Sequence, residues 1–148
     1  MTIATKKTLW LGALVIVSSL FLAVTDLRAQ DPVRCSKATL HGTYALSGSG
    51  LKYGVPIAVT GEITYDGQGK ATLVTETVSP NGTIYRGITG TGVFTLNSDC
   101  TGSETFTTSE TTDFDFVITA DGSKITWIET DQGSVLTGTE VRLDRRHK

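Results

Sequence analysis

The chain has 148 residues, of which 39% are hydrophobic and 19% charged, and its formal net charge is −2 at neutral pH. A chain of this length can bury one hydrophobic core. Its weak negative charge does not favour nucleic acid or an anionic membrane surface as a partner, and its one basic cluster, Arg142 with residues 145–148, is typical of a solvated tail. We therefore expect one domain that binds no nucleic acid.

The first residues indicate export. Lys6 and Lys7 precede an apolar run over residues 9–24, which is typical of a secretory signal peptide. The run is shorter than most membrane-spanning helices, and charged residues separate it from Ala29, the expected cleavage position. We predict a signal helix within residues 1–29, and a mature chain that leaves the membrane for the periplasm or the cell exterior. An uncleaved N-terminal anchor is the alternative.

The chain has two cysteines, Cys35 and Cys100. Oxidising compartments preserve disulfides, so two cysteines in an exported chain predict a bond between them. This bond would tie the N-terminal segment, residues 30–40, to the middle of the following domain. The Cys-x-x-Cys spacing of redox-active thiols is missing, which favours a structural bond.

From residue 41 the composition is typical of β-strands, since Thr, Val, Ile, Tyr and Phe recur and no stretch has an apolar stripe at helical spacing. Hairpin turns are indicated by residues that tolerate positive φ. These turn signals are Asp66-Gly67-Gln68-Gly69, Asn81-Gly82, Asp121-Gly122 and Asp131-Gln132-Gly133. Further breaks are expected at 48–54, 97–102 and 110–112. The predicted strands are 41–48, 55–65, 70–78, 83–96, 103–110, 113–120, 124–131 and 134–143.

Every predicted connection is short, which favours an up-and-down meander. Eight such strands can close on themselves and remove both sheet edges. The fold class we predict is therefore all-β, an eight-stranded antiparallel barrel over residues 41–144, followed by a basic tail at 145–148. Gly87, Gly90 and Gly92 fit the bends of a closing sheet, although they could equally be bulges in an open sandwich.

Several of these elements together resemble a family of uncharacterised exported bacterial proteins that is similar in fold to the calycin-like barrel of allene oxide cyclase. The elements are Cys35, Leu40, Gly42-Thr43-Tyr44, residues 61–69, residues 97–102, Thr130-Asp131 and Gly133. The resemblance covers nearly all of the mature chain and implies an eight-stranded barrel with a Cys35–Cys100 bond. It implies no function, because the catalytic motifs of the plant cyclases have no residue-by-residue match in this chain.

Standard catalytic and metal-binding motifs are missing from the sequence. The two histidines, His41 and His147, stand far apart, and no metal-ligand spacing, nucleophile elbow, phosphate loop or dinucleotide fingerprint occurs. We therefore expect no metal and no cofactor.

Period-2 alternation predicts which side chains face the interior. Most are apolar, but Arg86 shares a face with Ile88 and Phe94, and Glu129 shares one with Trp127. Burial of either charge alone would be costly, so we expect them to form a pair. The pair could be structural, one residue could instead be turned outward by a bulge, or the two could be polar anchors of a pocket.

These positions define the expected ligand-binding residues: Tyr44, Tyr65, Arg86, Phe94, Phe116, Trp127 and Glu129. A small apolar ligand is the expected partner of a binding or structural barrel. One alternative is an isomerase or cyclase of the allene oxide cyclase type, for which Glu129 is the only catalytic candidate. Another is an extracellular surface or matrix subunit. No sequence feature indicates an oligomeric state.

Overall fold

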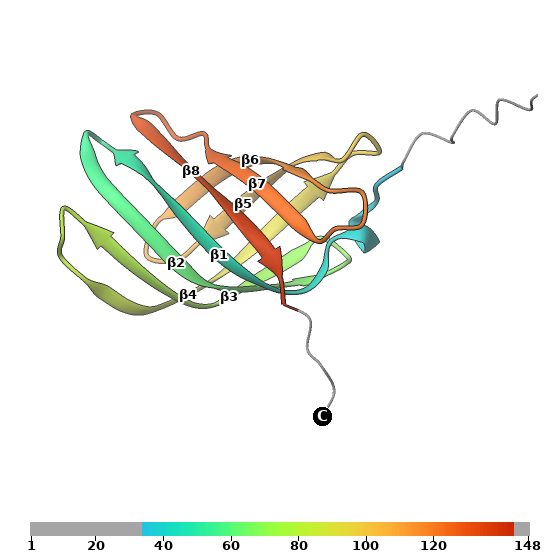
Figure 1. The fold of residues 1–148 in the computed structure, drawn as a ribbon, viewed down its shortest axis with the longest axis horizontal. Coiled ribbons are helices and arrows are strands. Elements are labelled where there is room, and N and C mark those ends of the chain that lie inside the picture. The colour runs from blue at the N-terminus through green and yellow to red at the C-terminus, as the bar shows by residue number, and fades with distance from the viewer. Residues whose placement is uncertain (1–33, 144–148) are drawn as a thin grey trace, which may run out of the picture.

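The computed structural model describes residues 34–143, which form a closed barrel of eight antiparallel strands (Figure 1). Each strand pairs with its neighbours in the chain, and β1 pairs with β8 to close the sheet. The up-and-down barrel is therefore confirmed. The strands are β1 (His41–Lys52), β2 (Val55–Asp66), β3 (Lys70–Pro80), β4 (Tyr85–Leu96), β5 (Thr101–Thr107), β6 (Thr111–Ile118), β7 (Lys124–Glu129) and β8 (Ser134–Arg142).

Both chain ends fall outside this description. The expected signal helix and cleavage position lie outside the described residues, as does the basic tail at 145–148. Within residues 34–143, no helix is long and apolar enough to cross a membrane.

The first hairpin differs from the prediction. The expected loop at 48–54 is wrong, because β1 continues to Lys52 and the turn is confined to Tyr53 and Gly54. Gly48 and Gly50 serve close packing instead of a turn. A Cβ atom on Gly48 would lie 2.5 Å from the Trp127 ring, and one on Gly50 would collide with the backbone of β8. The other strand ends differ from the predicted ones by at most three residues.

Two β-bulges, one in β3 and one in β4, change which side chains face the barrel interior. In β4, Gly87 has a φ of 71° and interrupts the pairing with β3, so Arg86 points outward although it is two residues from the inward Ile88. The expected inward position of Arg86 is therefore wrong, and the alternative that a bulge turns one of the two charged residues outward is confirmed for Arg86. In β3, Val74 is the extra residue opposite β2, and the bulge turns Glu76 toward the barrel interior.

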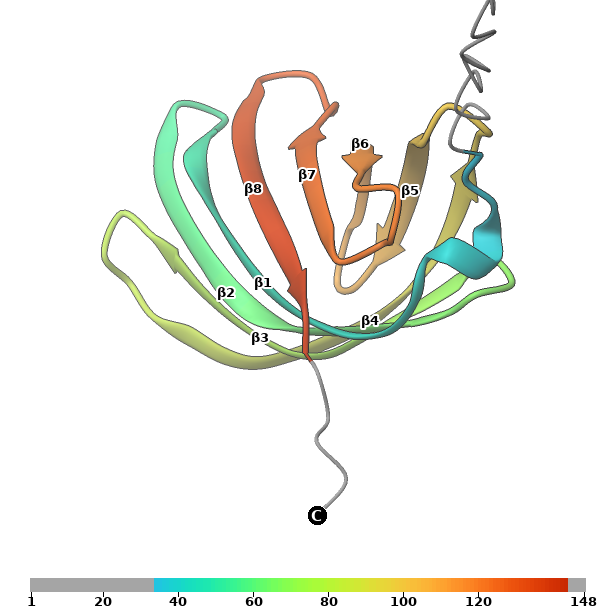
Figure 2. The ribbon, with the colours of Figure 1, turned by 45° about the vertical axis from the view of Figure 1, so that its right-hand side comes forward.

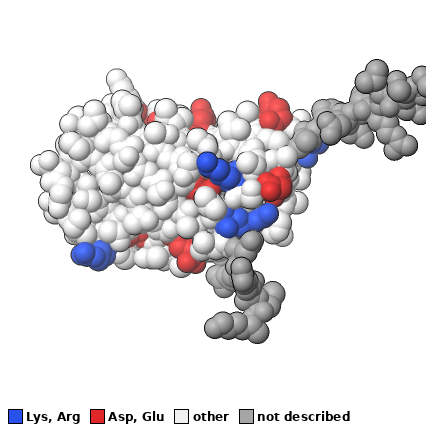
Figure 3. All heavy atoms as spheres, viewed as in Figure 1, with Lys and Arg blue, Asp and Glu red and all other residues white. Residues whose placement is uncertain are grey.

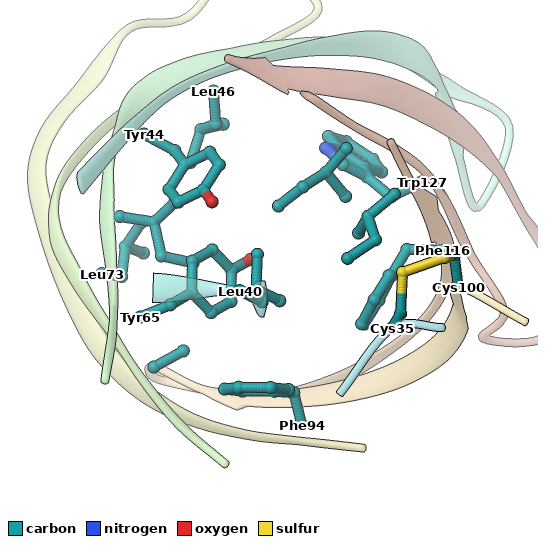
Figure 4. Packing of buried hydrophobic residues seen from close by; sticks show 14 of the residues in the cluster. Cys35, Leu40, Tyr44, Leu46, Tyr65, Leu73, Phe94, Cys100, Phe116 and Trp127 are labelled. Carbon is teal, nitrogen blue, oxygen red and sulfur yellow. A yellow bond between two sulfur atoms is a disulfide. The ribbon is translucent and has the colours of Figure 1, made fainter. Parts of the chain in front are cut away.

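One end of the barrel is closed by the N-terminal segment and the 3₁₀ helix η1 (Lys37–Thr39) (Figure 2). Leu40 follows η1 and is fully buried. The predicted disulfide is present, with the Cα atoms of Cys35 and Cys100 5.0 Å apart. We call η1 and Leu40 the plug. At the same end of the barrel the Tyr44 hydroxyl donates a 2.6 Å hydrogen bond to the Gly122 carbonyl. The core side chains converge from the surrounding strands (Figure 4).

Candidate ligand-binding site

A cavity of about 450 Å³ occupies the barrel beyond this closed end. It extends to the opposite end, where the β5–β6 turn and the end of β1 contribute Ser109, Glu110 and Lys52 to its lining. Most of the wall is apolar because the inward positions of the strands alternate with outward polar ones. The apolar lining residues are Leu46, Ile57, Val59, Ile63, Leu73, Val78, Ile88, Phe106, Phe114, Trp127 and Leu136.

Lys52 forms an ion-pair network at the mouth of the cavity. Its Nζ lies 3.2 Å from Glu129 Oε1 and 3.0 Å from Glu110 Oε1. Ser134 Oγ donates a further hydrogen bond of 2.6 Å to Glu129 Oε1. Burial disfavours the charged ammonium, but hydrogen bonds to the two carboxylates outweigh it and raise the pKa of Lys52. The mouth is thus a fixed, charge-paired cluster.

Two carboxyl groups and a phenol meet deeper in the barrel. The Tyr65 hydroxyl lies 3.0 Å from Glu104 Oε2 and 3.0 Å from Glu140 Oε2, and all three side chains are buried. A phenol has one proton and can donate to only one carboxyl, so the second contact requires a proton on the other. At least one of the two glutamates is therefore neutral in this arrangement.

The electrostatics of these groups agree with that proton count. Burial raises the pKa of Glu140 to about 8, although its hydrogen bond with Tyr65 lowers it in part. Burial and the neighbouring Glu140 raise the pKa of Glu104 well above its ordinary value. Burial likewise raises the pKa of Tyr65, which keeps its proton. On the β3 part of the cavity wall, burial also raises the pKa of Glu76, to about 7.

Trp127 lines the wall from β7 and is packed closely against residues of the neighbouring strands. Its ring packs edge-to-face against Phe114, with centroids 5.4 Å apart. A Cβ atom on either Gly48 or Gly138 would come within 2.5 Å of the indole, so these glycines provide the space that the ring occupies. Figure 4 shows Trp127 across the barrel from Tyr44 and Tyr65.

The structure divides the predicted site residues into three groups. Trp127 and Glu129 line the cavity. The four aromatic residues Tyr44, Tyr65, Phe94 and Phe116 are buried in the core, and of these Tyr65 reaches the cavity carboxyls through its hydroxyl. Arg86 is exposed and Glu129 pairs with Lys52, so the expected Arg86–Glu129 pair is wrong.

Four polar residues of the cavity were not predicted from the sequence: Lys52, Glu76, Glu104 and Glu140. Alternation along β5 and β8 indicates two of them, because Glu104 is in phase with Phe106 and Glu140 with Leu136. Lys52 was not predicted because the first strand was expected to end at residue 48, whereas β1 continues to Lys52. Glu76 faces inward only because of the β3 bulge, which alternation does not reveal.

Residues 34–143 contain no group of three or more His, Cys, Asp or Glu arranged to hold a metal ion. Comparison of the chain with protein-family models, with curated proteins and with solved structures finds no match. Any assignment of function therefore depends on the cavity itself.

Proposed function

We propose that this barrel binds a small, predominantly apolar molecule in its interior. The observation that supports this most directly is the cavity of about 450 Å³ with aliphatic and aromatic walls. Ligand sites of small molecules are commonly concave, mostly apolar and furnished with a few fixed polar groups. Here those groups are the Lys52–Glu129 pair at the mouth and the Glu104–Tyr65–Glu140 cluster farther in.

We also propose that the protein acts outside the cytoplasm. The Cys35–Cys100 disulfide supports this, because such bonds persist in oxidising compartments. The apolar run that follows Lys6 and Lys7 supports it independently, as a signal peptide. A ligand carrier with a covalently closed barrel end suits that environment.

Proton-transfer catalysis in the same cavity is a second candidate, in line with the resemblance to the allene oxide cyclase barrel. The Glu104–Tyr65–Glu140 cluster favours it, because a neutral carboxyl beside a phenol can give or take a proton at a bound molecule. Glu129 fits the role less well, since it is already paired with Lys52. The test is deuterium exchange at the carbon next to the carbonyl of methyl nonyl ketone, measured by NMR. A rate equal to that in buffer alone would remove this candidate.

The outer surface gives less support to a surface or matrix subunit. Several of its exposed apolar side chains lie opposite polar ones: Val93 lies opposite Lys70, and Val117 lies opposite Thr101 and Thr126. Leu51 and Val135 are the exception, since they pair with each other. On the face shown in Figure 3 the charged side chains are few and scattered. The features that favour a binding role therefore lie inside the barrel.

Binding of the neutral fluorescent probe N-phenyl-1-naphthylamine tests the proposed function. We expect saturable binding at one site per chain. Val59→Trp, which fills the cavity from β2, should weaken binding by at least about tenfold, because the ring would occupy the volume of the ligand. Ala58→Trp is the matched control, since the neighbouring Ala58 is exposed on the outside of the same strand. Equal losses in both variants, or no binding by the wild-type protein, would contradict the proposal.

A further inference from the structure

Two buried polar atoms of residues that line the cavity are unpartnered within the described chain. They are Glu104 Oε1 and Trp127 Nε1. Glu104 is 5% exposed and Trp127 7% exposed, and both residues line the cavity. Buried polar atoms in native proteins are nearly always hydrogen-bonded, so two such atoms on one cavity wall indicate a group that the cavity receives.

The fold places these atoms on the same side of the barrel. Glu104 lies on β5 and Trp127 on β7, and both strands pair with β6 between them. Glu104 pairs across the sheet with Phe114, whose ring contacts Trp127. Both residues line the cavity, from strands that are separated only by β6.

Each side chain is also held before a ligand arrives. Glu104 is oriented by its other oxygen, which bonds the Tyr65 hydroxyl, and Trp127 is confined by Phe114 and by Gly138. Ordering flexible side chains costs affinity in most binding events. Here the side chains of Glu104 and Trp127 are already ordered in the folded protein, so ligand binding loses little conformational entropy at these two residues.

The chemistry of the two atoms selects the ligand group. An indole N–H can only donate, so the ligand must contain an acceptor, which excludes an ammonium group. Glu104 Oε1 can accept a hydrogen bond, or donate one when it carries the carboxyl proton. A hydroxyl can accept from Trp127 and donate to Glu104, and a carbonyl oxygen can accept from both.

The charges of the cavity exclude a ligand carboxylate. Among residues 34–143, five carboxyl-bearing residues line the cavity, and the single lining cation, Lys52, is already shared by Glu110 and Glu129. A ligand anion near Glu104 would be buried without a counter-ion and close to Glu140. A fatty acid anion is therefore a poor fit to this cavity.

We propose that the cavity is selective for uncharged apolar molecules with one hydroxyl or carbonyl oxygen, held between Glu104 Oε1 and Trp127 Nε1. This inference rests on the proposed binding function and names its ligand class. It adds a polar recognition site that is separate from the ion-pair network at the mouth.

The first test is displacement of N-phenyl-1-naphthylamine by four ligands with linear apolar chains of nine or ten carbons. Decanol and methyl nonyl ketone should displace the probe, whereas decanoate should bind at least about tenfold more weakly because of the unpaired buried charge. Decylammonium should also bind more weakly than decanol, since it cannot accept from the indole. The ratio of decanol to ketone affinity then distinguishes the hydroxyl from the carbonyl as the preferred group.

The second test separates the hydrogen bonds from cavity shape. Trp127→Phe removes the N–H and should weaken decanol binding roughly threefold to tenfold, the contribution of one hydrogen bond, while binding of the probe changes much less. Glu104→Leu, which replaces the carboxyl by an apolar group of similar size, should also weaken decanol selectively. Asp115→Asn is the control and should leave decanol affinity unchanged, because Asp115 is exposed on the outside of β6.

The possible failures are distinguishable. If the probe binds but decanoate or decylammonium matches decanol, the cavity binds ligands and the selectivity inference is wrong. The inference is equally wrong if Trp127→Phe and Glu104→Leu bind decanol as well as the wild-type protein does. If neither the probe nor any of the four ligands binds, the proposed function itself fails.

Discussion

Lys52 and Glu129 form an ion pair across a strand that separates them. Lys52 ends β1 and Glu129 ends β7, while β8 lies between these strands in the barrel. The Nζ–Oε1 distance is 3.2 Å, and the Glu129 side chain is only 1% exposed. Because Glu129 is so deeply buried, its charge depends on Lys52 for compensation.

This pair predicts that Lys52→Met destabilises the protein, by about 2 kcal/mol, because it leaves Glu129 buried without its cation. Denaturant unfolding at neutral pH measures the change. The matched control is Arg86→Met, which should have little effect since Arg86 is exposed. Adding Glu129→Leu to Lys52→Met should restore part of the lost stability. A larger loss for Arg86→Met than for Lys52→Met would contradict the assignment of the pair.

The buried carboxyls predict that the protein becomes less stable as the pH rises. The pKa is raised to about 8 for Glu140 and to about 7 for Glu76, from an ordinary value of 4.5. Between these values the folded state holds protons that the unfolded state has released, so the unfolding free energy falls with increasing pH. The stabilisation is complete below about pH 4.5 and is lost as the pH passes through 7 and 8.

Unfolding curves between pH 5 and pH 9 test this dependence. Each carboxyl should contribute a slope of up to roughly 1.4 kcal/mol per pH unit within its window, reduced for Glu76 because it is partly exposed. Glu140→Gln should flatten the curve between about pH 5 and pH 8, where the folded wild-type protein holds a proton on Glu140 that the unfolded chain has lost. A wild-type stability that rises over this range would contradict the prediction.

Reduction of the disulfide should destabilise the barrel. The Cys35–Cys100 bond closes a loop of 65 residues, and in the chain-entropy model such a bond stabilises by up to roughly 4 kcal/mol. Removing it should release the plug formed by η1 and Leu40 from the closed end. Thermal unfolding with and without a reducing agent measures the loss. The Cys35→Ser/Cys100→Ser double variant should match the reduced protein, and free thiols in the unreduced protein would contradict the bond.

Export predicts a shortened chain. Protein recovered from its native host should begin close to Gln30, because cleavage is expected after Ala29. Intact-mass measurement of the isolated protein provides the test. A full-length chain recovered from the membrane fraction would show that residues 1–29 act as an anchor.

The sequence alone determined the architecture. Short turns such as Asn81-Gly82, with φ values of 46° and 83°, join strands of alternating apolar residues, and both signals are local. A meander of eight such strands has few ways to bury one apolar face, and closure removes its edges. The disulfide followed from the presence of only two cysteines, and the inward positions of Trp127 and Glu129 followed from alternation along one strand.

The polar chemistry of the interior was decided only by the tertiary structure. The bulge at Gly87 turns Arg86 outward, and the bulge at Val74 turns Glu76 inward, because one extra residue reverses the faces of all that follow. Glu129 received Lys52 as its partner because β1 extends through Gly48 and Gly50, whose lack of side chains makes room for Trp127 and β8. Tyr65 meets Glu104 and Glu140 only when closure of the barrel brings β2, β5 and β8 around one interior, a contact between distant segments that no local pattern contains.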